Sequence, residues 1–483
     1  MSIRSQASSS TLRRFGGSFF GFTSIHQVIH NLPDLDRLLA HGHHILDGEP
    51  RDWTILVRVF GGENPKGLRE KIQEILIPIN TATERLFTNE VNANAAAERA
   101  DIPGKAASLV TFSDDPQNLA RWEWSANVRV VTPNANGHGG AAEADLHNLI
   151  RDLGACVSIP QLYGQDFLDR SLTLLNDLWK FDNDLFPMLM VGVPEWAPFQ
   201  VMKDGLAARS RLHQQLAALY KRADQYLKGE SVDFNADMSD ISHVVRERTK
   251  LYNKMDVPFR HRGQIDLGNL WAQNANTHPL VFWLVLYIYS TPGLVGELRK
   301  EISPYITLSD TPALTITVFD LRSICSKCPL LRSSMYETFR MANQPTSIRY
   351  LNRPMTIHDG QQEHHLKSGT WISAVHAVLQ KDSSVYPEPE KFIPDRFLES
   401  DKENGNKVAR YGKLRPWGTG PGMCKGRIFA EKEILGIAAA VIALWDIEPV
   451  SKVWKVPAMR PGTGVNRPVH DVRVIIKKRV MTQ

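Results

Sequence analysis

The sequence has little cysteine and no long apolar run. Its 483 residues include only four cysteines, too few and too unevenly spaced for a disulfide framework in a chain of this size. They are Cys156, Cys325, Cys328 and Cys424. The longest apolar runs, 279–289 and 435–444, are about half the roughly 20 residues that span a bilayer. We therefore expect a reducing compartment, no transmembrane helix, and a buried helix in each run.

Charge of neither sign dominates, and no dense basic block is present. Lys and Arg number 57 against 52 Asp and Glu, which gives a formal net charge of +5 over the whole chain. A nucleic-acid-binding arm would concentrate its basic residues in one block. Apolar residues make up 42% and charged residues 23%, which excludes collagen-like, low-complexity and wholly disordered proteins. We expect a folded protein that does not bind nucleic acid.

The first 33 residues contain no acidic side chain. They include Arg4, Arg13, Arg14 and a serine cluster at 8–10, a bias that organellar transit peptides share. A disordered tail, or a start downstream of a membrane anchor, explains the same bias, and the sequence does not separate these readings. We interpret 1–22 as an N-terminal tail, disordered or the remnant of a missing anchor. We expect a cytoplasmic or endoplasmic-reticulum-associated protein rather than a mitochondrial one.

The apolar spacing is mainly helical, with a few short β-prone runs. Helical stretches are predicted at 33–43, 64–87, 166–227, 266–290, 330–341 and 424–445, and β-prone runs at 24–29 and near 348, 357 and 371. Strands and helices do not alternate as in a Rossmann unit, and no sharp change of composition follows residue 23. We expect a mainly α fold with a small β-sheet region, forming one domain over 23–483.

The segment 415–427 is the most informative part of the sequence. It reads RPWGTGPGMCKGR and ends where a strongly apolar helical pattern begins. Its glycines let the backbone curl around a ligand, and a helix start would stabilise a thiolate at Cys424. Cys424 is therefore a candidate metal ligand, or a nucleophile that would need a histidine base. A phosphate-binding loop is disfavoured, because no strand clearly precedes the glycines and no Lys-Ser or Lys-Thr follows.

Two further segments place polar residues in unusual settings. Glu337 and Arg340 lie three positions apart on one predicted helix face, and Arg396 follows about 55 residues later. A carboxylate between two guanidiniums can be buried with its lone pairs satisfied. The segment 270–279 is a polar notch in an apolar helix. Because Pro279 has no N–H to give, the notch should open and leave a carbonyl free for water or a small ligand. The alternative is a kinked core helix whose polar groups bond one another.

In this order and spacing, the three segments resemble the cytochrome P450 family across nearly all of 23–483. The loop from Trp417 to Gly426 is similar to the family's haem-binding signature, with Trp417 in place of a phenylalanine and Gly420 and Gly426 conforming. The resemblance implies the triangular, α-rich, single-domain cytochrome P450 fold, with haem b (iron protoporphyrin IX) as cofactor and Cys424 as axial iron ligand. Segments 271–283 and 462–472 are similar to the branch that holds sterol 7α-hydroxylases and prostacyclin synthase, and a fungal type is expected.

The resemblance also implies roles for other residues. Thr277, with Asn276 and water, would deliver protons during O2 activation, and Arg349 would contact a haem propionate. The structural triad would be Glu337, Arg340 and Arg396. The substrate pocket would be lined by Asn274, Ala275, Thr346, Ile348, Gly464 and Val465.

Two positions depart from the family's pattern. Gly422 stands where the family usually has Arg or His, so one propionate contact must come from elsewhere. Candidates for that contact are Lys66, Arg69 and Lys71. Asn276 stands where the family usually has an acid, so proton delivery cannot rely on a carboxylate there.

The resemblance implies a haem-thiolate monooxygenase that hydroxylates or otherwise oxidises a hydrophobic small molecule of secondary metabolism, with a terpenoid, sterol or alkaloid-like scaffold. Its partners would be O2 and an external NADPH–cytochrome P450 reductase, and we expect a monomer. Basic residues flanking the thiolate loop would dock an acidic flavoprotein, or simply form a solvated rim: Lys413, Arg415, Lys425 and Arg427. A reductase-independent haem-thiolate isomerase or dehydratase, and a non-catalytic haem-binding relative, remain alternatives.

Overall fold

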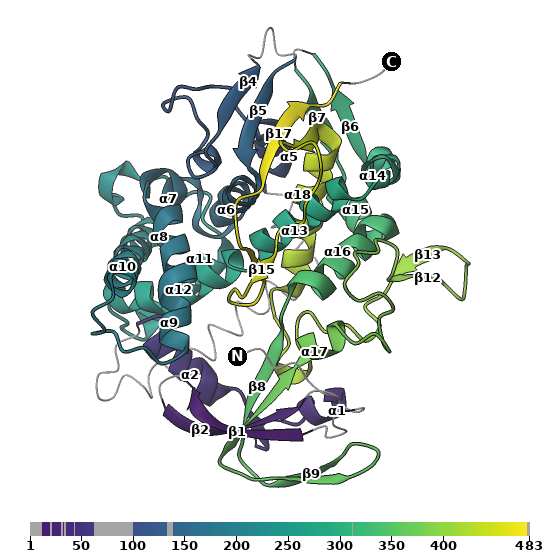
Figure 1. Cartoon of the computed structure of the whole chain (residues 1–483). Helices are drawn as coiled ribbons and strands as arrows, with labels where there is room; N and C mark the ends of the chain where they lie inside the picture. Colours follow the sequence, from purple (N-terminus) through teal and green to yellow (C-terminus); the bar gives the residue numbers. More distant parts are fainter. Residues whose placement is uncertain are drawn as a thin grey trace.

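Helices form about half of the chain and surround a few small sheets. The computed structural model describes residues 12–19, 22–29, 32, 35–42, 44–61, 100–132, 139–311 and 313–480. Two sheets lie at opposite ends of the molecule, with most helices between them (Figure 1). The prediction of a mainly α fold with a small β-sheet region is confirmed. Lys66, Arg69, Lys71 and the helix expected at 64–87 lie outside the described residues.

The described helices have the following bounds. They are α1 (Leu35–Leu39), α2 (Glu49–Arg58), α5 (Ile102–Ala107), α6 (Leu146–Tyr163), α7 (Gln165–Arg170), α8 (Leu174–Lys180), α9 (Phe186–Met190), α10 (Gln200–Lys228), α11 (His243–Lys254), α12 (Phe259–Asn274), α13 (Thr277–Ser290), α14 (Leu294–Ile302), α15 (Leu321–Lys327), α16 (Pro329–Ala342), α17 (His376–Gln380) and α18 (Arg427–Leu444). A π-helical turn, Phe181–Leu185, joins α8 to α9.

The larger sheet has the strand order β1-β2-β11-β8-β3. Its strands are β1 (Leu12–Phe19), β2 (Phe22–Ile29), β11 (Thr370–Val375), β8 (Thr346–Leu351) and β3 (Leu46–Asp47). β2 and β11 run parallel, and the other pairs are antiparallel. Residues 12–19 of the expected N-terminal tail therefore form a strand, whereas residues 1–11 lie outside the described part. The division of the chain at residue 23 stays a prediction.

The second sheet has the order β14-β17-β5-β4 and is antiparallel throughout. Its strands are β14 (Trp445–Pro449), β17 (Arg473–Lys478), β5 (Ala141–Asp145) and β4 (Arg129–Thr132). Four two-stranded ladders complete the β structure: β6 (Ile306–Ser309) with β7 (Thr315–Phe319), β9 (Met355–His358) with β10 (Glu363–Leu366), β12 (Leu398–Ser400) with β13 (Lys407–Ala409), and β15 (Met459–Arg460) with β16 (Arg467–Pro468).

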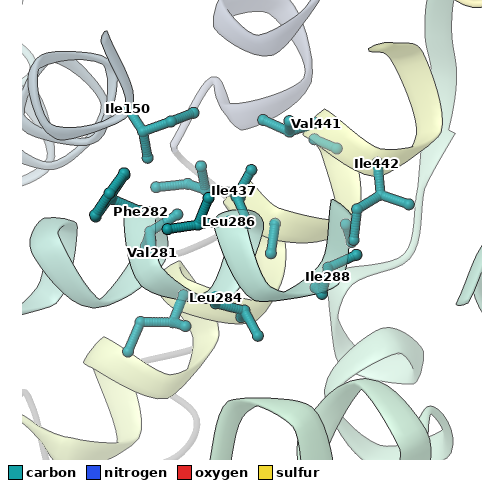
Figure 2. Close-up of a cluster of buried hydrophobic side chains, with 14 of the residues drawn as sticks. Ile150, Val281, Phe282, Leu284, Leu286, Ile288, Ile437, Val441 and Ile442 are labelled. Carbon is teal, nitrogen blue, oxygen red and sulfur yellow. The ribbon is translucent and has the colours of Figure 1, made fainter. Parts of the chain in front are cut away.

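The core is built around α13 and α18, the two apolar runs of the sequence. Both helices are buried on nearly all sides, because hydrophobic residues cover their whole circumference. Figure 2 shows side chains of α13 and α18 meeting Ile150 of α6. The labelled α13 and α18 residues are Val281, Phe282, Leu284, Leu286, Ile288, Ile437, Val441 and Ile442. Each such side chain stabilises the fold by about 1.5–3 kcal/mol when fully buried, so this packing holds α13 and α18 in fixed positions.

The helix expected at 266–290 is divided where the proline pattern indicates. α12 ends at Asn274 and α13 begins at Thr277, because Pro279 has no N–H to bond the carbonyl of Ala275. The polar notch therefore lies at a break between two helices. This break sets the direction of the side chains at 276 and 277.

Candidate active site

A tight loop brings Cys424 to the start of α18. The loop passes through a 3-10 turn at Gly420–Gly422, after which the Cys424 N–H bonds the carbonyl of Trp417 at 2.9 Å. Gly420 has a φ of +71°, and a Cβ there would collide with the main-chain carbonyl of Leu39 in α1. Position 420 therefore requires glycine.

The Cys424 thiol is open to solvent on one side and faced by donors on another. Its side chain is exposed. The protein atoms around its other sides nevertheless withdraw it from water, and this burial raises the pKa of the thiol. The backbone N–H of Gly426 and the charge and N–H of Arg427 act in the opposite direction. A bound metal cation would favour the thiolate further, so this geometry suits a ligand more than an inert buried cysteine.

Trp417 is held by contacts on two sides. Its indole N–H donates to the Tyr411 hydroxyl at 3.0 Å, and Tyr411 donates in turn to Glu431 at 2.8 Å. Its ring meets Phe339 edge to face, with the centroids 4.9 Å apart. These contacts connect the loop to α16 and α18 and fix the position from which Cys424 projects.

Arg349, on β8, points at the same loop. Only 4% of the residue is exposed. Its Nη1 donates to the carbonyl of Ile348 at 2.8 Å, whereas its Nη2 is buried and has no hydrogen-bond partner among the described residues. A Cβ at position 422 would overlap the guanidinium of Arg349. Gly422 thus leaves the space that Arg349 occupies.

Glu337 lies between two arginines in a buried ion cluster. Arg340 donates to both carboxylate oxygens at 2.8 Å, and Arg396 Nε contacts both at 3.0 Å. Arg340 also donates to main-chain carbonyls, including that of Pro389 at 2.7 Å. The cluster ties α16 to the segment 387–396, as a structural triad would. The hydrogen bonds of this cluster do not involve the Cys424 thiol, so its role is to stabilise the fold.

The break between α12 and α13 is bound to the C-terminal loop. The Asn276 Oδ1 accepts the N–H of Val465 at 3.1 Å, and Gly464 lies so close that a Cβ there would meet the Asn276 side chain. Thr277 begins α13 and is 8% exposed. Asn276 is therefore used in fixing the loop.

The Ala275 carbonyl at the break already has a hydrogen-bond donor, whereas the sequence predicted that it would be free for a ligand. Arg467 donates to the Ala275 oxygen at 2.7 Å and to Asp182 at 2.7 Å. Asp182 also accepts from the indole of Trp271 at 2.9 Å and the hydroxyl of Thr463 at 3.0 Å. The freed-carbonyl expectation is wrong, because a guanidinium satisfies that oxygen. Sequence reasoning missed Asp182 and Arg467, since nothing in the pattern links residues 285 positions apart.

A second polar network that the sequence did not indicate joins α6, α13 and α18. Ser158 donates to Glu433 at 2.8 Å and lies 3.1 Å from Nε2 of His278, which also lies 3.0 Å from the Asn274 amide oxygen. Burial raises the pKa of Glu433 to about 8 and lowers the pKa of His278 to about 3. Both groups are therefore kept neutral inside the core. The sequence signal that could have indicated this network was Glu433, an acidic residue inside the apolar pattern of α18.

The expected substrate-pocket residues lie in different surroundings. Asn274 and Ala275 are completely buried, and the Asn274 amide donates to the carbonyl of Leu270 at 2.8 Å. Thr346 is exposed, and Ile348 and Gly464 are half-buried. Val465 is buried and bridges Asn343 after α16. Their role in substrate binding stays a prediction.

The donors around the loop fit a haem. An open soft sulfur at Cys424 suits iron, and the unpaired buried Nη2 of Arg349 suits a carboxylate, the charged group that a haem carries at its edge. The two lie close to one another, because Arg349 reaches from β8 to Gly422, which is two residues from Cys424. Without a bound carboxylate, the buried Nη2 of Arg349 has no hydrogen-bond partner among the described residues, which is costly.

Comparison with known proteins identifies the family. The family model described as Cytochrome P450 matches residues 170–472, well over half of the chain. The chain belongs to the cytochrome P450 family. This cytochrome P450 domain includes the thiolate loop, the Glu337 cluster and the α12–α13 break, and the predicted family is confirmed. Membership implies a haem cofactor.

Curated relatives are similar at low identity. A cytochrome P450 monooxygenase of Gibberella zeae is 26% identical over 67% of this chain and 60% of its own length. Cytochrome P450 monooxygenase poxD of Penicillium oxalicum is 27% identical over 66% and 61%. Cholesterol 7-alpha-monooxygenase of Cricetulus griseus is 24% identical over 62% and 58%. The chain therefore spans about three fifths of the length of these relatives.

Other cysteines and helices do not add a second site in the described part of the chain. Burial raises the pKa of Cys325 and of Cys328 to about 12, which makes both thiols inert. No cluster of three or more His, Cys, Asp or Glu among the described residues is arranged to hold a metal ion. In the same residues, no single helix has the length and apolar character needed to cross a membrane.

Proposed function

We propose that this protein is a haem-thiolate monooxygenase that inserts oxygen into a hydrophobic small molecule. The observation that carries the proposal is the Cys424 side chain, which is exposed and faced by N–H groups at the start of a buried helix. The two fungal relatives are named cytochrome P450 monooxygenases. The haem type we propose is haem b.

Three residues of the chain would hold the cofactor, each by a different contact. Cys424 would bind the iron, Arg349 would bind a carboxylate of the haem, and the pinned Trp417 would support the loop. When bound, the haem would supply the redox-active iron at which O2 is activated, and the Cys424 thiolate would donate electron density to that iron. Glu337 and its arginines keep the fold beneath the site.

Proton movement would depend on Thr277. Its hydroxyl can accept a proton from water and donate one, at the N-terminus of α13 where the break opens the helix. The Asn276 Oδ1 is held by Val465 and carries no titrating proton. We therefore propose that Thr277 Oγ1 and water hold and pass protons, while Asn276 orients the segment.

Electrons would come from a separate NADPH–cytochrome P450 reductase. The thiolate loop is flanked by exposed Lys413 and Lys425, and complementary charge raises the rate of encounter with an acidic partner. Arg415 is partly neutralised by Asp36 at 2.6 Å, so it would contribute less. Charge reversal at Lys425 should slow reduction at low salt, and an unchanged rate would argue for a solvated rim instead.

The substrate class rests on the relatives. One relative is named cholesterol 7-alpha-monooxygenase, and another is named 7-alpha-hydroxycholest-4-en-3-one 12-alpha-hydroxylase. We propose a sterol, terpenoid or alkaloid-like scaffold. A spin-state titration of the purified holoprotein against a panel of these scaffolds tests this proposal, with tight binding of one class as the expected result and no spectral shift from any of them as the contrary one.

The oxidative reaction itself is tested with two measurements. The reduced carbonyl complex should show the red-shifted thiolate Soret band, and Cys424→Ser should lose it. Product should form only when NADPH and a reductase are both added. Product formation without a reductase would indicate an isomerase or dehydratase, and absence of the thiolate band in the unaltered protein would refute the proposal.

A further inference from the structure

A second arginine reaches the place where Arg349 lacks a partner. Arg51, on α2, donates through Nη1 to the carbonyl of Ile348 at 3.2 Å. Arg349 Nη1 donates to that same oxygen at 2.8 Å. Two guanidiniums, one from α2 and one from β8, therefore converge on one carbonyl. Burial, and next the charge of Arg51, lower the pKa of Arg349, which agrees with this proximity.

The charges at this point are not balanced. Arg51 pairs with Asp52 at 2.7 Å, but the carboxylate of Asp52 is 62% exposed and its attraction is weakened by solvent. No carboxylate forms an ion pair with Arg349 among the described residues, and its Nη2 is both buried and unpaired. A buried cation is costly unless an anion accompanies it. The geometry calls for an anion beside Arg349.

Gly422 explains why Arg349 can occupy this place. A Cβ at position 422 would overlap the Arg349 guanidinium. An arginine or histidine at 422 and the observed position of Arg349 therefore exclude each other. The space left by glycine is filled from β8, and the second cation comes from α2.

We propose that Arg51 and Arg349 form a paired-guanidinium receptor for a haem propionate, and that glycine at 422 is the residue that admits it. The inference rests on the proposed haem function and adds Arg51, and the exclusion between positions 349 and 422, to it. The propionate would accept from Arg349 Nη2 and share its second oxygen with Arg51.

Haem release from the holoprotein to excess apomyoglobin tests the role of Arg51. A lost charge-assisted hydrogen bond should speed release about tenfold or more in Arg51→Ala. Arg51→Lys should recover part of the loss, because it keeps the charge. The matched control is Arg353→Ala, which removes an exposed arginine from the turn after β8. Equal release rates for Arg51→Ala and this control would overturn the proposal.

An exchange of positions tests the role of Gly422. Gly422→Arg should speed release, because the new side chain displaces Arg349 and strains the Cys424 loop. Gly422→Arg combined with Arg349→Ala should hold haem better than Gly422→Arg alone, since one guanidinium again fills the space. Retention by Gly422→Arg that equals the unaltered protein, or a double variant no better than the single, would contradict the exclusion.

Haem dimethyl ester separates carboxylate binding from an effect on the fold. In holoprotein carrying the ester, the difference between Arg51→Ala and the unaltered protein should disappear, because the carboxylates are neutralised. A difference that persists with the ester would mean that Arg51 acts through the fold, and would overturn the receptor. The thiolate Soret band distinguishes failure of the proposed haem function from failure of the receptor. Its absence from the unaltered protein refutes the haem function. Its presence, together with an unchanged rate of haem release in Arg51→Ala, refutes only the receptor.

Discussion

Arg467 donates a hydrogen bond to the main-chain oxygen of Ala275, 192 residues earlier in the chain. The contact satisfies the carbonyl that Pro279 leaves without a donor. It also fixes the C-terminal loop against the helix break, because the same guanidinium pairs with buried Asp182. The position of Thr277 beside this break therefore depends on residues from three distant segments.

Loss of this arginine should destabilise the fold strongly. Arg467→Ala leaves the Asp182 carboxylate buried and unpaired with its guanidinium, which should cost about 3–5 kcal/mol in the free energy of unfolding. Urea unfolding of the holoprotein measures this change. Arg460→Ala, at an exposed position on β15, is the matched control and should change stability by less than about 0.5 kcal/mol. Similar values for the two variants would show that Arg467 is dispensable.

Glu337→Gln should destabilise the fold to a similar extent. The substitution leaves two guanidiniums facing a neutral amide, with the Arg340 side chain 0% and the Arg396 side chain 9% exposed. Removing the charged partner of a buried cluster costs about 3–5 kcal/mol, so we expect little soluble protein or a large loss of stability. Glu399→Gln removes an exposed carboxylate and should have no such effect. Normal yield and stability for Glu337→Gln would exclude a structural role.

Glu433 should make stability fall as the pH rises. Its pKa is about 8 in the fold against 4.5 for an ordinary glutamate carboxyl, so the native state binds the extra proton between these values. Stability from this group is therefore present at low pH and lost toward pH 8, by up to about 1.4 kcal/mol per pH unit. Glu433→Gln should remove this slope, as measured by urea unfolding at pH 5, 6, 7 and 8. Identical slopes in the two proteins would contradict the assignment.

Thr277→Ala should uncouple NADPH consumption from product. The hydroxyl is the side chain at the break that can pass a proton, so its loss should release more peroxide per NADPH consumed. Thr277→Ser keeps the hydroxyl and is the matched control. Peroxide and NADPH are measured in the reconstituted system with added reductase. A ratio in Thr277→Ala equal to that of the serine variant would place proton delivery elsewhere.

The local features of the fold were predictable, and the contacts between distant segments were not. Pro279 predicted the break between α12 and α13, and the apolar pattern predicted α16 and α18 to within a few residues. Of the helix expected at 33–43, the described residues form α1, residues 35–39, while residues 33, 34 and 43 lie outside the described part. Hydrophobic periodicity predicts which face of a helix or strand is buried, but it does not predict which other element packs against that face. The Arg467 contact and the Arg51 approach therefore emerge only from the tertiary structure.

The place of β17 in its sheet has a consequence for biosynthesis. β17, residues 473–478, lies beside β5 (Figure 1). In the sheet it stands between β14 and β5, and its Val474 pairs with Ala144. While the ribosome is still adding this segment, β5 has an open edge toward the missing strand, and such edges invite pairing with other chains. Nascent molecules therefore keep this edge open until β17 has left the ribosome and paired with β5. Chains truncated before β17 would keep this edge of β5 open, so we expect them to aggregate.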